Sequence, residues 1–157
     1  MLIQKDYEKL LELFNKHKVK YCIVGAYAVA FHVLPRYSKD MDILVEPSLE
    51  NGEKIVKALK DFGFGSLKLK KESFARECAV IQLGYEPVRV DIVTSVDGCD
   101  FKTVWKNKKT GRYGKEKLFF IGMADLIANK KATNRPIDRF DLEALLKAKI
   151  KKSVKNS

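Results

Sequence analysis

The stretch VGAYAVAFHVLPRYSKDMDILVE, residues 24–46, contains the pattern that decides the fold. A hydrophobic strand predicted over residues 19–24 runs into Gly25, and a helix of small residues is predicted over residues 26–34, where Pro35 ends it. A glycine between a strand and a helix lets the backbone approach a ligand, and the free N–H groups of a helix N-terminus favour an anion. The corner at Gly25 is therefore a candidate phosphate-binding site, although such corners are also common in proteins without one.

Two aspartates open the next predicted strand, residues 40–46. Residues two apart on a strand face the same side, about 6.5 to 7 Å apart, so Asp40 and Asp42 share one face while Met41 faces the other. Two carboxylates on one face repel each other unless a cation lies between them. Because Mg²⁺ takes oxygen ligands, together with water and phosphate oxygens, the pair is a candidate magnesium site. The alternative is a solvated strand start.

A third aspartate interrupts the β-branched run VRVDIV, residues 88–93. Arg89 and Asp91 share one face of this predicted strand. Aspartate is disfavoured inside strands, so Asp91 needs a partner there. Either it forms a cross-strand ion pair, or it is the third member of a metal site with Asp40 and Asp42 on a neighbouring strand. The second interpretation explains all three acids at once.

The rest of the chain mixes helices and strands without a strict βαβ alternation, which indicates an α+β fold. Helices are predicted over residues 4–17, 48–62, 124–131 and 136–150, with Ser48 as an N-cap and Pro136 at a first helical position. Strands are predicted over residues 78–83 and 88–93, as a hairpin with a four-residue loop, and over 118–122. Residues 97–116 are predicted to be irregular.

Composition and charge narrow the class of protein. The chain has 157 residues, of which 46% are hydrophobic and 32% charged, which predicts one globular domain over residues 1–157. Its core is expected at about 19–122, its C-terminal helices at 123–150 and a basic tail at 151–157. No signal-peptide pattern and no apolar run of roughly 20 residues is present, so a cytoplasmic protein without a membrane partner is expected. The net charge of +11 attracts polyanions.

These motifs together resemble the nucleotidyltransferase fold. Residues 24–46 are similar to its active-site motif, in which a hydrophobic strand, two small residues and a helix precede Arg-x-Ser and Asp-x-Asp. VRVDIV is similar to its third-carboxylate strand. The variant with Arg-x-Ser before the acids resembles the minimal nucleotidyltransferases and the abortive-infection toxin group, whose C-terminal segment resembles ADLIANKKATNRPIDRFDLEAL, residues 124–145. The resemblance implies a mixed β-sheet with flanking helices and a C-terminal helical segment.

The resemblance also implies an activity and a set of site residues. A nucleoside monophosphate would move from a nucleoside triphosphate, with ATP the expected donor, to a hydroxyl of a protein, RNA or small molecule. The catalytic and metal-binding residues would be Asp40, Asp42 and Asp91, holding Mg²⁺ or Mn²⁺ in a two-metal mechanism. The nucleotide-binding residues would be Gly25, Ala26, Arg36, Ser38, Lys39, Lys130 and Arg135. Asp138 and Asp141 match the C-terminal motif, or are simply acids favoured near a helix N-terminus.

Two other interpretations remain open. Ala26 stands where the family usually has glycine or serine, so a hydroxyl that could bond a phosphate is missing. This departure favours a weakly catalytic or non-catalytic toxin–antitoxin or regulatory component with a cognate protein partner. The charge of +11 favours a basic nucleic-acid-binding module, whose binding would depend strongly on salt.

Overall fold

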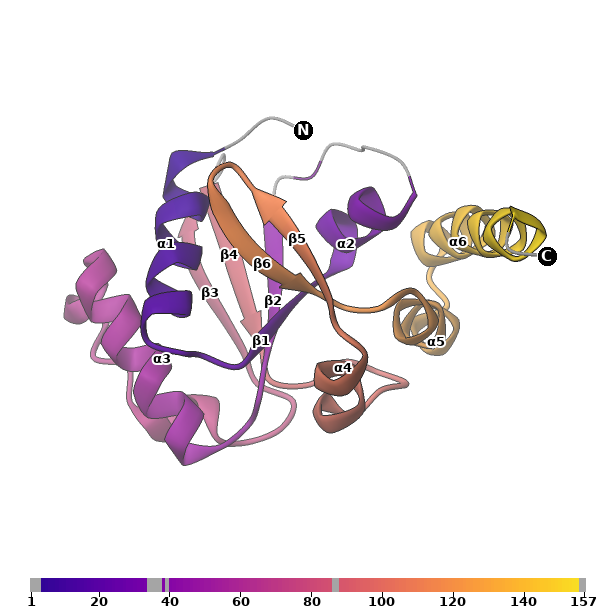
Figure 1. Cartoon of the computed structure of the whole chain (residues 1–157). Coiled ribbons are helices and arrows are strands. Elements are labelled where there is room, and N and C mark those ends of the chain that lie inside the picture. Colours follow the sequence, from indigo (N-terminus) through magenta and orange to yellow (C-terminus); the bar gives the residue numbers. More distant parts are fainter. Residues whose placement is uncertain (1–3, 34–37, 39, 86–87, 156–157) are drawn as a thin grey trace.

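A six-stranded mixed sheet forms the centre of the computed structural model, which describes residues 4–33, 38, 40–85 and 88–155 (Figure 1). The strand order is β3-β4-β2-β1-β6-β5. The strands are β1 (Tyr21–Val24), β2 (Asp40–Val45), β3 (Val80–Tyr85), β4 (Val88–Val93), β5 (Lys109–Tyr113) and β6 (Glu116–Phe120). β1 runs antiparallel to β2 and parallel to β6, and β2 runs parallel to β4. The predicted α+β class and mixed sheet are confirmed.

Apart from α4, which lies below the sheet in Figure 1, the helices form two groups to its left and right. In the first group α1 packs against α3, and in the second α6 packs against α5 and α2. The helices are α1 (Lys5–Lys16), α2 (Gly25–His32), α3 (Leu49–Phe62), α4 (Phe101–Asn107), α5 (Met123–Thr133) and α6 (Pro136–Lys155), with short 3₁₀ turns η1 (Gly65–Leu67) and η2 (Lys71–Phe74). No helix within the described ranges combines the length and hydropathy needed to cross a bilayer.

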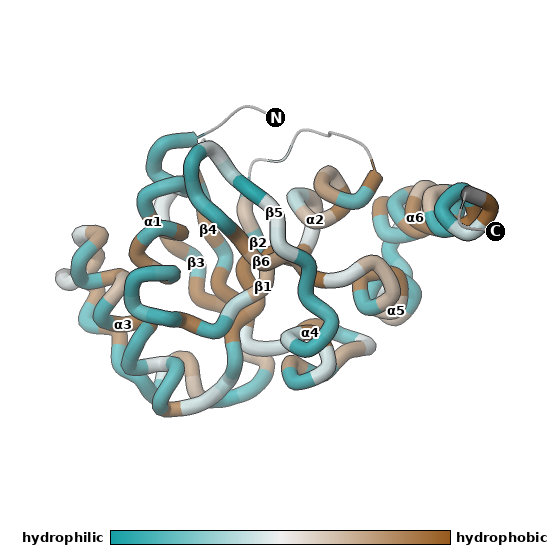
Figure 2. Tube along the Cα trace, viewed as in Figure 1, coloured by the Kyte–Doolittle hydropathy of each residue, from teal (hydrophilic) through white to brown (hydrophobic). Residues whose placement is uncertain are grey.

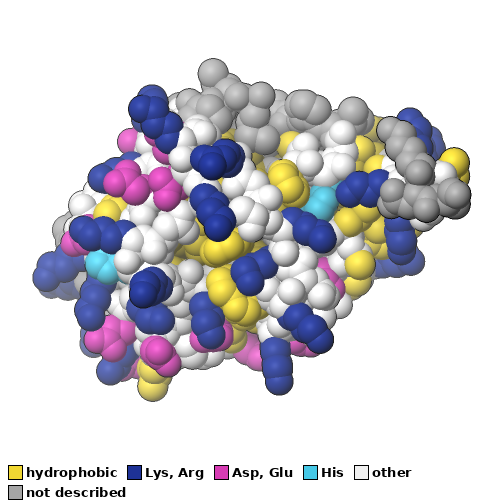
Figure 3. Space-filling model, viewed as in Figure 1, with side chains coloured by type: hydrophobic (Ala, Val, Ile, Leu, Met, Phe, Trp, Pro, Cys, Tyr) yellow, Lys and Arg dark blue, Asp and Glu magenta, His cyan; other side chains and the backbone are white. Residues whose placement is uncertain are grey.

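The core follows the predicted alternation of β2. Met41, Ile43 and Val45 are fully buried on the face opposite the aspartates, and they belong to one hydrophobic cluster with the buried stripe of α1. Figure 2 shows hydrophobic residues gathered in the central strands, while the outer strand β5 is mainly hydrophilic. Lys and Arg side chains are spread over much of the face seen in Figure 3.

Ser48 and Gly52 explain the start of α3. The Ser48 hydroxyl accepts a hydrogen bond from the Asn51 N–H at 3.1 Å, which confirms the predicted N-cap. Gly52 weakens the first turn by propensity, but a β-carbon there would overlap the carbonyl oxygen of Lys71 in η2. The glycine is therefore required by the close approach of η2 rather than by a break in the helix.

The prediction that residues 97–116 are irregular was wrong, because they form α4 and β5. Asp100 caps α4 by accepting a hydrogen bond from the Thr103 N–H at 2.8 Å. Gly111, within the stretch predicted to be irregular, lies inside β5, where a β-carbon would come within 2.7 Å of the Phe31 ring and 2.8 Å of the Phe120 ring. The predicted four-residue hairpin loop is also shorter, since β3 extends through residues 84 and 85.

Candidate active site

Three carboxylates and one guanidinium occupy neighbouring positions on β2 and β4. The parallel register places Asp40 beside Arg89 and Asp42 beside Asp91. Because each pair of residues is two apart on its strand, all four side chains share one face of the sheet. The predicted adjacency of the three aspartates is therefore what the structure contains, and we call these four residues the charge square.

Arg89 neutralises part of this square. Its Nε and Nη2 atoms donate to Oδ1 and Oδ2 of Asp91, both at 3.1 Å, in a bidentate ion pair. Its Nε also lies 3.7 Å from Oδ1 of Asp40 on the neighbouring strand. The ion pair considered for Asp91 thus exists, but within β4 rather than across strands.

The surroundings of Asp42 disfavour a negative charge on its side chain. Burial, followed by the nearby charges of Asp91 and Asp40, raises the pKa of its carboxyl group to about 6, against smaller opposing effects of Lys130 and Arg89. A bound cation would stabilise the ionised form of Asp42, which lies near two other carboxylates.

Gly25 lies directly against Asp42. Its φ of +68° belongs to the left-handed region that favours glycine, and a β-carbon at this position would overlap Oδ2 of Asp42. The preceding N-cap residue is Val24, whose side chain offers no acceptor to the first N–H groups of α2. The corner therefore places a carboxylate beside the start of a helix that no side chain caps.

A cavity of about 500 Å³ opens at this corner, a size that fits a small-molecule ligand. It brings the predicted residues Gly25, Asp42, Lys130 and Arg135 together, although they are far apart in the sequence. The other lining residues are Val24, Val93, Ser95, Val96, Asp97, Asn129 and Thr133.

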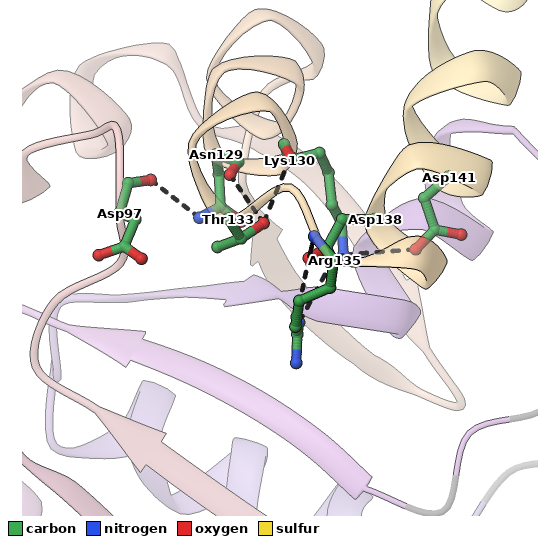
Figure 4. Close-up of polar contacts among 7 residues, drawn as sticks. All are labelled: Asp97, Asn129, Lys130, Thr133, Arg135, Asp138 and Asp141. Atoms are coloured by element: carbon green, nitrogen blue, oxygen red, sulfur yellow. Dashed lines mark hydrogen bonds and ion pairs between the residues drawn. The ribbon is translucent and has the colours of Figure 1, made fainter.

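Two buried aspartates of α6 hold the cations of the cavity (Figure 4). The Lys130 Nζ atom lies 3.2 Å from Oδ1 of Asp138 and 3.3 Å from Oδ2 of Asp141, and the Lys130 side chain is only 7% exposed. Arg135 donates from Nε to Oδ2 of Asp138 at 2.7 Å and from Nη2 to Oδ1 at 3.2 Å. The two aspartates therefore position the lysine and arginine, rather than only favouring a helix end.

No protein-family model and no curated protein matches the sequence. Among solved structures, a Thermotoga maritima protein assigned as a nucleotidyltransferase, TM1012, aligns with a TM-score of 0.57 at 17% identity, over 99% of this chain and 96% of that chain. The lincosamide antibiotic adenylyltransferase LnuA, bound to lincomycin, aligns with a TM-score of 0.54 at 18% identity, over 92% and 96%. This chain has the nucleotidyltransferase fold.

Two of the predicted nucleotide-binding residues that the structure describes, Ala26 and Ser38, do not line the cavity. Arg36 and Lys39 fall outside the described residues. The Ser38 hydroxyl donates to the Asp40 carbonyl at 2.7 Å and accepts from the Asp40 N–H at 3.3 Å, so it fixes the start of β2. Ala26 is the second residue of α2 and is not among the residues that line the cavity.

Sequence reasoning missed the polar residues that complete the cavity. The Asn129 side chain donates from Nδ2 to the Asp97 carbonyl at 2.9 Å, which joins α5 to the loop after β4. The Thr133 hydroxyl lies one turn beyond and donates to the Asn129 carbonyl at 3.1 Å. The position of Asn129 beside Lys130 on the predicted helix of residues 124–131, and the position of Asp97 shortly after a predicted strand, were the available signals.

Divalent metal is the group that the fold implies, and the donor atoms fit it in part. Oδ1 of Asp40 is buried and accepts no hydrogen bond from a described residue, and Asp42 carries a carboxylate that a cation would stabilise. However, within the described part of the chain no three carboxylate, histidine or cysteine side chains are arranged to hold a metal ion. Both oxygens of Asp91 are turned to Arg89 instead. The site thus contains carboxylates of the kind that a divalent metal ion takes, but one of them, Asp91, is paired with Arg89.

Proposed function

We propose that this protein transfers a nucleoside monophosphate from a nucleoside triphosphate, ATP being the expected donor, to a hydroxyl group of an acceptor. The observation that carries the proposal is the contact of Gly25 with Asp42 in a cavity that Lys130 and Arg135 also line. A glycine corner, a carboxylate and two cations within one cavity match what a metal-bound triphosphate requires. The likeness of the fold to an adenylyltransferase supports the same activity.

The triphosphate would lie between α2 and α5. The first N–H groups of α2 would donate to its oxygens, because no side chain caps them. Lys130 would supply a fixed positive charge, since Asp138 and Asp141 hold it in place. The described contacts of Arg135 use Nε and Nη2, which leaves Nη1 to donate to a phosphate.

The aspartates would serve the reacting end. Asp40 and Asp42, joined by Asp91, would hold Mg²⁺ or Mn²⁺, which supplies charge stabilisation for the attacking and leaving oxygens when bound. The acceptor hydroxyl oxygen bonds to the α-phosphorus, and the bond from that phosphorus to the β-phosphate oxygen breaks, so pyrophosphate leaves. Asp91 is the group on the neighbouring strand that would take the hydroxyl proton.

Transfer of label distinguishes this reaction from other phosphoryl chemistry. ATP labelled on the α-phosphate and ATP labelled on the γ-phosphate are incubated with the protein, Mg²⁺ and three acceptor pools: total RNA, total protein and small-molecule extract. We expect label from the α-phosphate alone to appear on one pool, with pyrophosphate released, and Asp42→Asn to abolish it. Transfer of the γ-label, or α-label transfer unchanged in Asp42→Asn, would contradict the proposal.

A further inference from the structure

We propose that the Arg89 guanidinium occupies Asp91, the third carboxylate of the charge square. It must be displaced before Asp91 can bind a metal ion. Arg89 would then set the metal affinity of the site. This inference rests on the proposed function, and it goes beyond it by assigning a regulatory role to a residue of the same face. Nothing about the three aspartates alone requires an arginine between them.

Arg89 offsets part of the negative charge of the three carboxylates in the charge square. Three carboxylates and one guanidinium carry a net charge of −2 (three negative, one positive), which one divalent cation balances. Asp42 and Asp91 stand directly opposite each other on adjacent strands, where like charges are destabilising. With Arg89 in contact with Asp91 and near Asp40, the face tolerates its carboxylates without a metal ion.

Arg89 and a metal ion compete for the same oxygens. A bidentate guanidinium uses both oxygens of Asp91, whereas Mg²⁺ needs at least one of them. Oδ1 of Asp40 is buried and lies 3.7 Å from the Arg89 Nε atom, but it accepts no hydrogen bond from the described residues. Asp40 and Asp42 are therefore available at once, while Asp91 becomes available only when the guanidinium turns away. This explains why three ligands do not converge in the structure.

The structure lets the Arg89 side chain move without its backbone. The Tyr7 hydroxyl donates to the Arg89 carbonyl at 2.8 Å and accepts from the Arg89 N–H at 3.1 Å, so the backbone is held from both sides. The Tyr7 ring packs at 6.0 Å from the ring of Tyr27 and 6.2 Å from that of Tyr113. The Arg89 side chain is 32% exposed, and solvent offers it an alternative position.

Binding of Mn²⁺ alone, measured by the loss of the free-ion signal in electron paramagnetic resonance, tests the inference. Wild type, Arg89→Gln, Arg89→Lys and Asp40→Asn/Asp42→Asn are compared, each checked for a cooperative melt. Since two charge-assisted hydrogen bonds no longer compete, Arg89→Gln should bind Mn²⁺ roughly 10- to 100-fold more tightly. Arg89→Lys keeps the charge without the bidentate geometry and should fall between the two.

Arg112→Gln is the matched control. Arg112 is an exposed residue of β5 and does not line the cavity, and its substitution removes the same charge. The Arg112→Gln variant should therefore bind Mn²⁺ as tightly as wild type. Equal or weaker binding by Arg89→Gln, with binding still lost in the double aspartate variant, would overturn the inference alone. Absence of Mn²⁺ binding in every protein would overturn the proposed function, and this inference with it.

Discussion

Gly25 and Asp42 are in direct contact across the corner where β1 meets α2, so that a β-carbon on Gly25 would overlap the Asp42 carboxylate. Gly25→Ala should therefore lower the free energy of unfolding for two reasons, the strain of a side chain at a φ of +68° and the overlap with Asp42, by about 2–4 kcal/mol in total. It should also abolish binding of MgATP, because Asp42 has to move. Thermal melts and calorimetric titration measure the two effects.

Gly63→Ala is the control for this substitution. Gly63 also has a positive φ, at +116°, but a β-carbon there meets no atom within 4 Å. The variant should lose some stability from backbone strain and keep its affinity for MgATP. If Gly25→Ala bound MgATP as tightly as Gly63→Ala, the corner would not be a phosphate site.

Arg135 should contribute to nucleotide binding through its exposed guanidinium. Its side chain is 68% exposed, and it lines the cavity. Arg135→Ala should weaken MgATP binding by roughly 10- to 100-fold, the value expected for a hydrogen bond to a charged group. Arg139→Ala removes the same charge one turn further along α6, outside the cavity, and should change the affinity little. Equal effects of both variants would mean that only the overall charge matters.

Asp138 should stabilise the fold in a pH-dependent way. Burial alone would raise its pKa, but hydrogen bonds from Arg135 and Lys130 outweigh burial and hold the pKa well below its usual range. The stabilisation is therefore present above the pKa of the unfolded chain and is lost as pH falls through the lower folded value. At about pH 7, Asp138→Asn should lose about 3–5 kcal/mol, because it leaves Lys130 buried without one of its partners.

The pH series of urea unfolding checks this prediction. The difference between wild type and Asp138→Asn should shrink as the pH falls below about 4. Glu143→Gln is the control, since Glu143 pairs with Lys147 at 3.1 Å on the exposed side of α6, and such pairs contribute at most about 1 kcal/mol. A constant difference between wild type and Asp138→Asn down to about pH 2 would contradict the assignment.

Asp42 should destabilise the metal-free protein. Its folded pKa of about 6 lies above the ordinary value of 3.8, so the folded state holds the proton more tightly and stability falls as pH rises between these values. In the presence of a chelator, Asp42→Asn should be more stable than wild type at about pH 8, by at most about 3 kcal/mol. The gain should vanish below about pH 4. Asp91→Asn, which removes the partner of Arg89, should not show the gain.

The sequence was sufficient to predict which face of the sheet carries the three aspartates. The alternation of Asp40, Met41 and Asp42 predicts which side chains of this strand are buried. The isolated acid in VRVDIV predicts that its strand lies beside the strand of Asp40 and Asp42, because an aspartate inside a strand needs a partner. The order of the strands and the pairing of Arg89 with Asp91 could not be predicted. Two alternatives were open for Asp91, and the choice depends on where a flexible side chain turns in the folded protein.

The remaining differences have tertiary causes. Gly111 pairs with Leu118 in the sheet, and two aromatic rings occupy the space that a β-carbon would need, whereas nothing local distinguishes it from a turn glycine. Lys130 was predicted from the resemblance, but its burial between Asp138 and Asp141 depends on how α6 packs against α5. Asn129 and Thr133 were missed for the same reason.

The most direct test of the proposed nucleotide site is calorimetric titration of ATP, CTP, GTP and UTP into the protein with Mg²⁺, beside Asp40→Asn/Asp42→Asn. Binding of at least one triphosphate should require Mg²⁺ and should be lost in the double variant, while its melting temperature shows that the variant is folded. Binding that is equally tight with a chelator, or unchanged in the double variant, would contradict a site in which these carboxylates hold a metal-bound triphosphate.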